Sequence, residues 1–147
     1  MKIKDFKHQN IAIIGSTKYK EEILSLAKEL EIGENTVLVS HVFSHSDGYE
    51  LTEDEVKIMV ENGHHRINIA DLIIAVVDKC IGESTFEEII YALTYGDKHH
   101  KESISTKVVY LYHIHEKDII GVLYNENSSK DDIMSAIEST EEYPKLS

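Results

Sequence analysis

One segment near the middle of the chain combines residue types that act on small polar molecules. It runs Gly82-Glu83-Ser84-Thr85-Phe86-Glu87-Glu88 and comes shortly after the apolar run 72–77. We expect the run to be a buried strand and the segment to open a helix. A carboxylate then lies in the first helical turn, at the edge where open α/β sheets bind small ligands. The pattern indicates an enzyme that attacks a small polar molecule with a carboxylate.

Two adjacent glutamates in this segment are candidates for the reacting carboxylate. We expect the helix dipole to favour the ionised form of Glu88, which suits a nucleophile or an electrostatic stabiliser. Glycosyl transfer uses such a carboxylate on one face of the sugar, with a second acidic group serving the leaving base or water. The alternative is that Glu87 and Glu88 only stabilise the helix start. Residue spacing alone favours that alternative.

Other polar residues are expected at the same edge of the sheet. The turn Gly15-Ser16-Thr17 can hold a phosphate or a sugar hydroxyl with its amides and hydroxyls, or it can be an ordinary strand–helix turn. Asp78 follows the third strand and lies near the site, whereas Asp71 precedes that strand and belongs to the opposite edge. Tyr19 is a candidate to orient a carboxylate or to stack on a base, and equally to pack at a helix start.

Apolar runs alternate with helical patterns along the chain. Consecutive apolar residues are typical of strands covered on both faces, as in parallel sheets. The expected strands are 11–14, 72–77 and 108–112, with weaker candidates at 36–40 and 119–124. The expected helices span 21–30, begin at Thr52, run from Ser84 to a stop at Gly96, and begin at Ser128 or Ser129. We therefore predict a flavodoxin- or Rossmann-like, doubly wound parallel α/β sheet of four to five strands, in the order 2-1-3-4-5.

Length and charge limit the possible functions. The 147 residues suit one domain, predicted at 1–138, followed by a loose polar tail, 139–147, which contains the only proline. The 15 basic and 27 acidic residues give a net charge of −12, which argues against nucleic-acid polymers and anionic membranes as partners. A small phosphorylated ligand stays possible, because a few local donors can outweigh the overall charge.

Cysteine and histidine usage limits the chemistry further. A single cysteine, Cys80, excludes an intramolecular disulfide framework and fits a reducing cytoplasm. The nine histidines have no metal-binding spacing, so we expect neither a metal nor another cofactor. Since parallel α/β domains of this size often pair through their helices, we also expect a homo-oligomer.

Several motifs together resemble the nucleoside 2-deoxyribosyltransferase-like family. They are Ala70–Val77, Ile81–Thr85 and Glu88–Ala92, with Ile13–Ser16 at the first strand. The family includes N-deoxyribosyltransferases and 2′-deoxynucleoside 5′-phosphate N-hydrolases. The resemblance covers roughly residues 10–112, and its Ile-Gly-Glu-Ser-Thr form is most similar to a bacterial and phage branch.

The resemblance implies a role for each matching residue. Glu88 matches the nucleophile that attacks the anomeric carbon, and Tyr91 matches a tyrosine or arginine of the same segment. The chain departs from the pattern at Gly63, where active members usually carry an aspartate for the leaving base, and at Ile90, where the family has a small residue. Candidates for the missing acid are Asp47, Asp78, Glu61 or a nearby histidine.

The expected function is therefore cleavage of a nucleoside or nucleotide N-glycosidic bond, or deoxyribosyl transfer. The expected catalytic residues are Glu88, Tyr19 and Asp78. The expected substrate-binding residues are Gly15, Ser16, Thr17, Gly82, Glu83, Ser84 and Thr85. Two alternatives stay open, namely a non-catalytic nucleotide-binding or sensor module on the same fold, and an interaction protein with a vestigial site.

Overall fold

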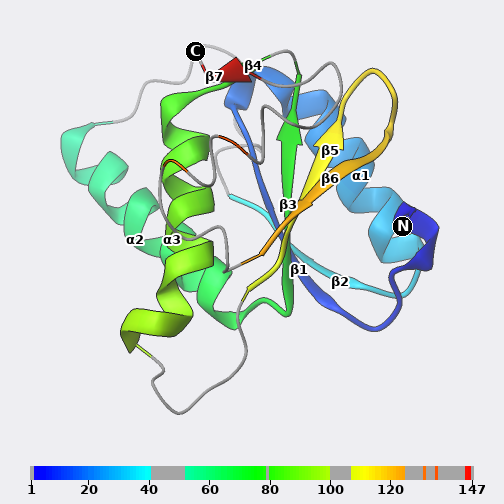
Figure 1. Cartoon of the computed structure of the whole chain (residues 1–147), viewed down its shortest axis with the longest axis horizontal. Helices are drawn as coiled ribbons and strands as arrows, with labels where there is room; N and C mark the ends of the chain where they lie inside the picture. Colours follow the sequence, from blue (N-terminus) through cyan, green and yellow to red (C-terminus); the bar gives the residue numbers. More distant parts are fainter. Residues whose placement is uncertain are drawn as a thin grey trace.

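A five-stranded sheet forms the centre of the computed structural model (Figure 1). The model describes residues 2–40, 52–78, 80–99 and 107–124, together with 131, 135 and 145–146. The strands are β1 (Asn10–Ile14), β2 (Thr36–Leu38), β3 (Leu72–Val77), β5 (Val109–His113) and β6 (Asp118–Leu123). Their order, β2-β1-β3-β5-β6, confirms the predicted flavodoxin- or Rossmann-like arrangement.

The last strand corrects the expectation of a wholly parallel sheet. Four strands are mutually parallel, but β6 runs antiparallel to β5. Only residues 114–117 connect the two strands, and in this turn Lys117 has a φ of 54° and donates its amide to the His113 carbonyl at 2.8 Å. A parallel return needs a crossover of a dozen or more residues, so this short connection requires a hairpin.

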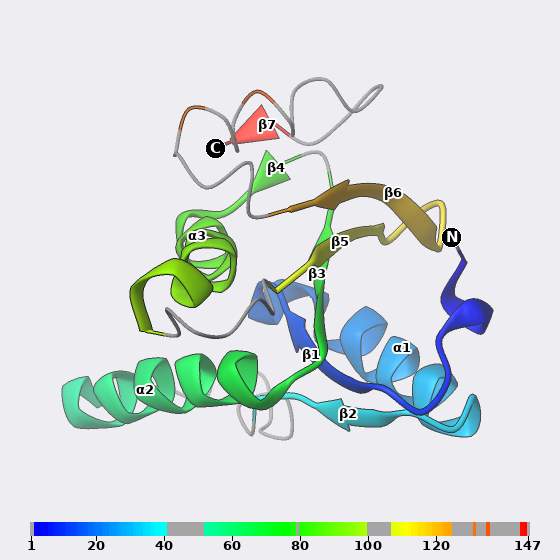
Figure 2. The same cartoon turned by 60° about the horizontal axis from the view of Figure 1, so that its bottom comes forward.

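Helices cover both faces of the sheet. Helix α1 (Lys20–Ile32) follows the short 3₁₀ helix η2 (Thr17–Tyr19) and packs on one face, while α2 (Glu53–Ile69) and α3 (Glu83–His99) lie on the other (Figure 2). The predicted stop of α3 at Gly96 is wrong, because the helix continues to His99. A glycine inside a helix costs only about 1 kcal/mol relative to alanine, which the rest of the helix tolerates.

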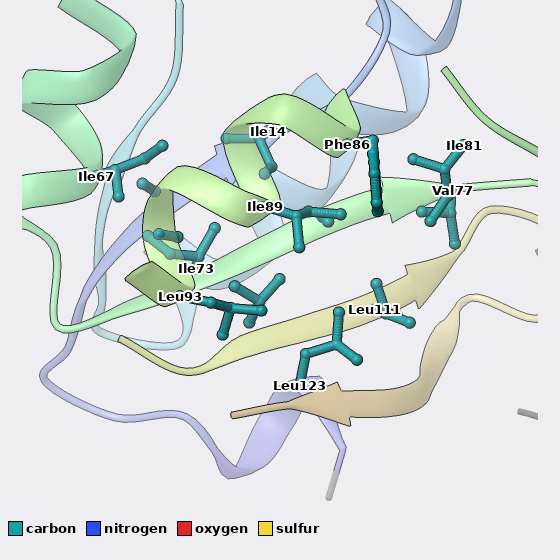
Figure 3. Close-up of a cluster of buried hydrophobic side chains, with 14 of the residues drawn as sticks. Ile14, Ile67, Ile73, Val77, Ile81, Phe86, Ile89, Leu93, Leu111 and Leu123 are labelled. Atoms are coloured by element: carbon teal, nitrogen blue, oxygen red, sulfur yellow. The ribbon is translucent and has the colours of Figure 1, made fainter. Parts of the chain in front are cut away.

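Two hydrophobic cores lie on opposite faces of the sheet, and β3 contributes to both. Its alternate residues Ile73, Ala75 and Val77 pack under α3, and the residues between them pack towards α1. Figure 3 shows Phe86, Ile89 and Leu93 of α3 on the first of these cores. This double coverage explains the uninterrupted apolar sequence of β3.

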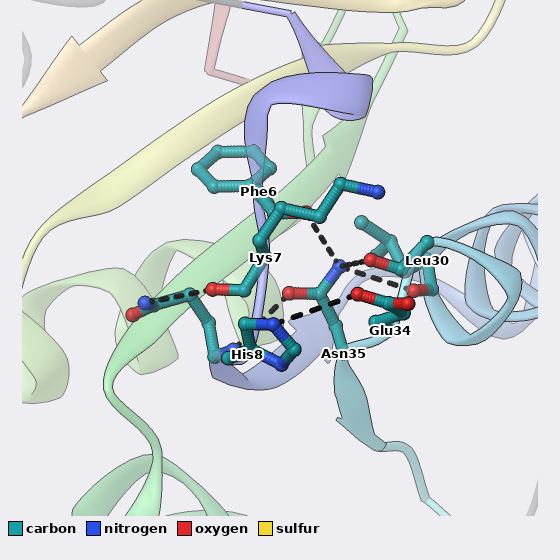
Figure 4. A network of polar contacts seen from close by, with 8 residues as sticks. Phe6, Lys7, His8, Leu30, Glu34 and Asn35 are labelled. Atoms are coloured by element: carbon teal, nitrogen blue, oxygen red, sulfur yellow. Dashed lines mark hydrogen bonds and ion pairs between the residues drawn. The ribbon is translucent and has the colours of Figure 1, made fainter.

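Buried polar contacts fix the end of the sheet away from the candidate site. Asn35 is 7% exposed. Its side-chain nitrogen donates to the carbonyls of Phe6 and Leu30 at 2.9 and 3.0 Å, and its side-chain oxygen accepts from the backbone amide of Gln9 at 3.2 Å (Figure 4). Asp71 accepts the Asn10 amide at 2.7 Å, in line with a structural rather than a functional position. These contacts join the N-terminal segment to the sheet and to the end of α1.

Part of the tail expected to be loose takes part in a second, smaller sheet. Strand β7 (Lys145–Leu146) pairs in parallel with β4 (Cys80–Ile81), which leads directly into Gly82. The loop expected at 41–50 lies outside the described residues. So does most of the helix expected from Ser128 or Ser129, of which residues 131 and 135 are helical. Among the described helices, none has both the length and the apolar character needed to cross a membrane.

Candidate functional site

A pocket of about 850 Å³ lies at the carboxyl edge of the sheet and extends between α2 and α3. The turn after β1 and the start of α3 form one end, and facing side chains of the two helices form the rest. The pocket is lined by Glu88 and by all seven residues predicted to bind substrate, namely Gly15, Ser16, Thr17, Gly82, Glu83, Ser84 and Thr85. Two turns that are far apart in the sequence, at 15–17 and 82–85, thus line one pocket, as expected for neighbouring strand ends.

The helical periodicity of α3 separates Glu88 from Glu87. Thr85, Phe86 and Ile89 are buried against the sheet, whereas Glu87 is exposed, although it also borders the pocket. Glu88 is half-buried and turned towards α2. A Cβ on Gly63 of α2 would lie 3.7 Å from Glu88 Oε2. Of the two glutamates, only Glu88 is partly buried and has its carboxylate close to Gly63 of α2.

The electrostatics of Glu88 differ from the sequence-based expectation. Burial raises the pKa of Glu88 from the ordinary 4.5 to about 7, and the nearby positive charge of Arg66 opposes this rise. The expected dipole effect is small here, because α3 begins at Glu83 and Glu88 lies beyond its first turn. At neutral pH the carboxyl group therefore exchanges between its protonated and ionised forms.

Arg66 of α2 is the counterpart of Glu88 in the pocket. Burial lowers the pKa of its guanidinium, and the Glu88 carboxylate opposes this shift. Its Nη2 would lie 3.6 Å from a Cβ on Gly63, and both groups line the pocket. The carboxylate of Glu88 and the guanidinium of Arg66, both partly desolvated, thus lie beside the space that a side chain on Gly63 would fill.

Asp78 and Tyr19 lie away from this pair. Asp78 is not among the residues lining the pocket, and its Oδ1 is 3.3 Å from His115 Nε2 and 3.9 Å from His113 Nε2. Tyr19 is 9% exposed, packs in the core beneath α1, and borders a smaller hollow of about 130 Å³ beside Ser16. Its position agrees with the packing alternative considered for a tyrosine at a helix start.

Two backbone amides fix the orientation of the His113 ring. Its Nδ1 accepts the amides of His115 and Glu116, each at 3.3 Å, so the ring proton resides on Nε2 and faces Asp78. Within the described ranges, no cluster of three or more histidine, cysteine or carboxylate side chains is arranged to hold a metal ion.

Sequence reasoning missed the contribution of α2 to the pocket. Val56, Met59, Val60 and Gly63 line it along one helical face. The spacing i, i+3, i+4 and i+7 is visible in the sequence, but such spacing is typical of a stripe that faces a packed core. Val56 and Val60 are 46% and 53% exposed, so this stripe faces the open pocket instead of a packed core.

An aromatic pair bridges the two helices within the pocket. The His64 and Tyr91 rings stack with centroids 3.8 Å apart and an interplanar angle of 6°. The Tyr91 hydroxyl donates to Asn68 Oδ1 at 2.9 Å. These contacts anchor α3 to α2 one helical turn beyond Glu88 and keep the carboxylate facing Gly63 and Arg66.

Comparisons of the chain with protein-family models, curated proteins and solved structures found no match. The geometry of the pocket therefore carries the functional argument.

Proposed function

We propose that this protein cleaves the N-glycosidic bond of a nucleoside or nucleotide, by hydrolysis or by deoxyribosyl transfer, with Glu88 as nucleophile. The observation that supports this most is the half-buried Glu88 carboxylate in a pocket whose other end is built from two strand–helix turns. The pocket volume falls within the roughly 300–1,000 Å³ typical of small-ligand sites. Its apolar wall on α2 suits a base, and its polar turns suit a sugar and a phosphate.

In this proposal the sugar lies over Gly15–Thr17 and Gly82–Thr85, with C1′ directed at Glu88. The ionised carboxylate attacks C1′ as the base departs, and water or an acceptor base then releases the sugar from Glu88. A pKa of about 7 leaves a substantial ionised fraction at neutral pH while keeping the carboxylate poorly solvated and reactive.

The test is release of free base from a panel of nucleosides and nucleoside 5′-monophosphates. Glu88→Gln should lower turnover at least about a thousand-fold, because it removes the nucleophile. Glu87→Gln, the matched control at the adjacent carboxylate, should retain most of the turnover, because Glu87 borders the pocket but is exposed. In the wild-type protein kcat/KM should fall below a pH of about 7, where Glu88 becomes protonated. Undiminished turnover by Glu88→Gln would show that the nucleophile is assigned wrongly.

A non-catalytic nucleotide-binding module is the second candidate. It is favoured by Gly63, because this position faces Glu88 and carries no acid to assist a leaving base. Calorimetric titration with the same nucleotides distinguishes the two functions. A sensor binds a nucleotide in a saturable manner and releases no base, whereas an enzyme releases base from the nucleotide it binds.

A further inference from the structure

The empty position at Gly63 separates two charged groups of opposite sign. Glu88 Oε2 and Arg66 Nη2 each lie within 4 Å of the point where a Cβ on residue 63 would stand. Among the described residues, the Arg66 side chain forms no hydrogen bond or direct ion pair, with Glu88 or with any other residue. The guanidinium therefore has N–H donors available for a ligand group that enters the space beside Gly63, which we call the Gly63 opening.

A guanidinium and a carboxylic acid assist a leaving group in different ways. An acid transfers a proton to the departing base, which suits bases that leave after protonation of a ring nitrogen, as purines do. Arginine keeps its proton and offers several N–H donors in a fixed plane. It therefore stabilises a base that leaves as an anion, with its negative charge on an oxygen next to the broken bond.

We propose that Arg66 is the leaving-group residue of this site and that the substrate carries a pyrimidine-2,4-dione base. The proposal rests on the function proposed above. Glu88 directs its carboxylate to C1′, and Arg66, on the other side of the Gly63 opening, donates to the C2 carbonyl oxygen beside the glycosidic nitrogen. A side chain at residue 63 would occupy the space in which that oxygen meets the guanidinium.

The proposed reaction replaces the bond from C1′ to the base by a bond from C1′ to Glu88. A Glu88 oxygen forms a bond to C1′, the C1′–N1 bond breaks, and its electron pair passes to N1 and is delocalised onto O2. Arg66 holds this anion by N–H···O hydrogen bonds and does not lose a proton. In hydrolysis, water then attacks C1′ and breaks the bond to Glu88. Its hydroxyl stays on the sugar, and its proton neutralises the departed base.

Base release from deoxyuridine and thymidine, compared with deoxyadenosine, and from the 5′-monophosphate of each, tests the proposal. The wild-type protein should favour the two pyrimidine-diones. Arg66→Gln should lower their kcat/KM about 10- to 100-fold, the effect of losing a hydrogen bond to a charged group. The same variant should lower kcat/KM for deoxyadenosine only a few-fold, because adenine leaves after protonation of a ring nitrogen and so develops little negative charge for Arg66 to stabilise. Arg66→Lys should retain part of the preference.

Two further measurements distinguish a role of Arg66 in base departure from a structural role. Arg66→Gln should move the acidic limb of the pH profile upward, because the cation that favours ionised Glu88 is lost. Gly63→Asp places a carboxylate beside Arg66 Nη2, so it should engage the guanidinium and shift the preference towards deoxyadenosine. A defect confined to folding would change neither the substrate ratio nor the pH limb.

The outcomes distinguish the proposal from the function on which it rests. If the wild-type protein releases no base from any of these compounds, the proposed function and this inference both fail. If it releases base but prefers deoxyadenosine, or if Arg66→Gln lowers all rates equally, only the role of Arg66 is overturned.

Discussion

Replacing the buried carboxylate of Glu88 should stabilise the protein at alkaline pH, whatever the ligand is. In the folded state the pKa of Glu88 is about 7, against an ordinary value of 4.5, because burial penalises its charged form more than Arg66 favours it. Below pH 4.5 the carboxyl is protonated in both the folded and the unfolded chain and has no effect. As the pH rises from 4.5 to 7, the unfolded chain ionises first, so the free energy of unfolding falls.

The magnitude follows from the two pKa values. Each tenfold change in an ionisation constant corresponds to about 1.4 kcal/mol. The rise from 4.5 to about 7 therefore costs about 3 kcal/mol of folding free energy at pH 8 and less than about 1 kcal/mol at pH 5. Glu88→Gln removes the titration, so its advantage over the wild-type protein should grow by about 2–3 kcal/mol between pH 5 and pH 8.

Urea unfolding at the two pH values measures this difference. Comparing the variant with the wild-type protein cancels the titration of the other acidic groups, which both proteins share. Glu87→Gln is the matched control, since it removes a neighbouring exposed carboxylate from the same helix. Its effect on stability should stay within about 0.5 kcal/mol at either pH.

A stability difference between Glu88→Gln and the wild-type protein that is equal at pH 5 and pH 8 would refute the reasoning. Glu88 would then titrate alike in the folded and unfolded chains, so its carboxylate would be well solvated. A difference that grows towards acidic pH would mean that the pair with Arg66 outweighs burial. The site would then be held together by an ion pair.

Two other substitutions test the packing around the site and at the far end of the sheet. Gly15→Ala should destabilise the protein by about 1–3 kcal/mol in thermal unfolding, because the new Cβ would lie 3.1 Å from Ile23 Cδ1 and 3.3 Å from Val76 Cβ. Gly82→Ala is the control and should be nearly neutral in the same assay, because no atom lies within 4 Å of its Cβ position. Asn35→Ala should lower the free energy of unfolding by about 2–4 kcal/mol, since it removes the side-chain partner of the Gln9 amide and of the Phe6 carbonyl, whereas the Leu30 carbonyl keeps the Asn35 backbone amide. A loss below about 1 kcal/mol in urea unfolding would show that water replaces the side-chain amide.

The main strands were predictable because buried strands have a distinctive apolar sequence, and their order followed from the right-handed crossover rule for alternating strands and helices. A central strand covered on both faces has apolar residues at every position, as β3 has, so such strands can be located in the sequence. The direction of β6 was missed, although the four-residue connection at 114–117 contains the necessary information. The end of α3 was missed because a single glycine costs a helix only about 1 kcal/mol and is therefore a weak stop signal.

The site was predictable to the extent that the chain topology determines it. Strand ends meet at one edge, so Gly15 and Gly82 had to approach each other. Arg66 was not predictable in the same way, because its role depends on how α2 packs against α3 across residues distant in sequence. The raised pKa of Glu88 was missed for the same reason, since local sequence indicates the helix dipole and only the packed structure reveals desolvation. The expected homo-oligomer stays a prediction.

The electrostatic character of the pocket favours a catalyst over a sensor. A pocket that only holds a nucleotide gains nothing from a poorly solvated carboxylate, because ionised Glu88 repels the phosphate and destabilises the folded protein at alkaline pH. A sugar losing its base develops positive charge at C1′ and negative charge on the base. Glu88 and Arg66 lie beside Gly63, so the negative carboxylate can face the positive charge at C1′ while the positive guanidinium faces the negative charge on the base. Groups arranged in this way favour the transition state over the bound substrate, which is the requirement for catalysis.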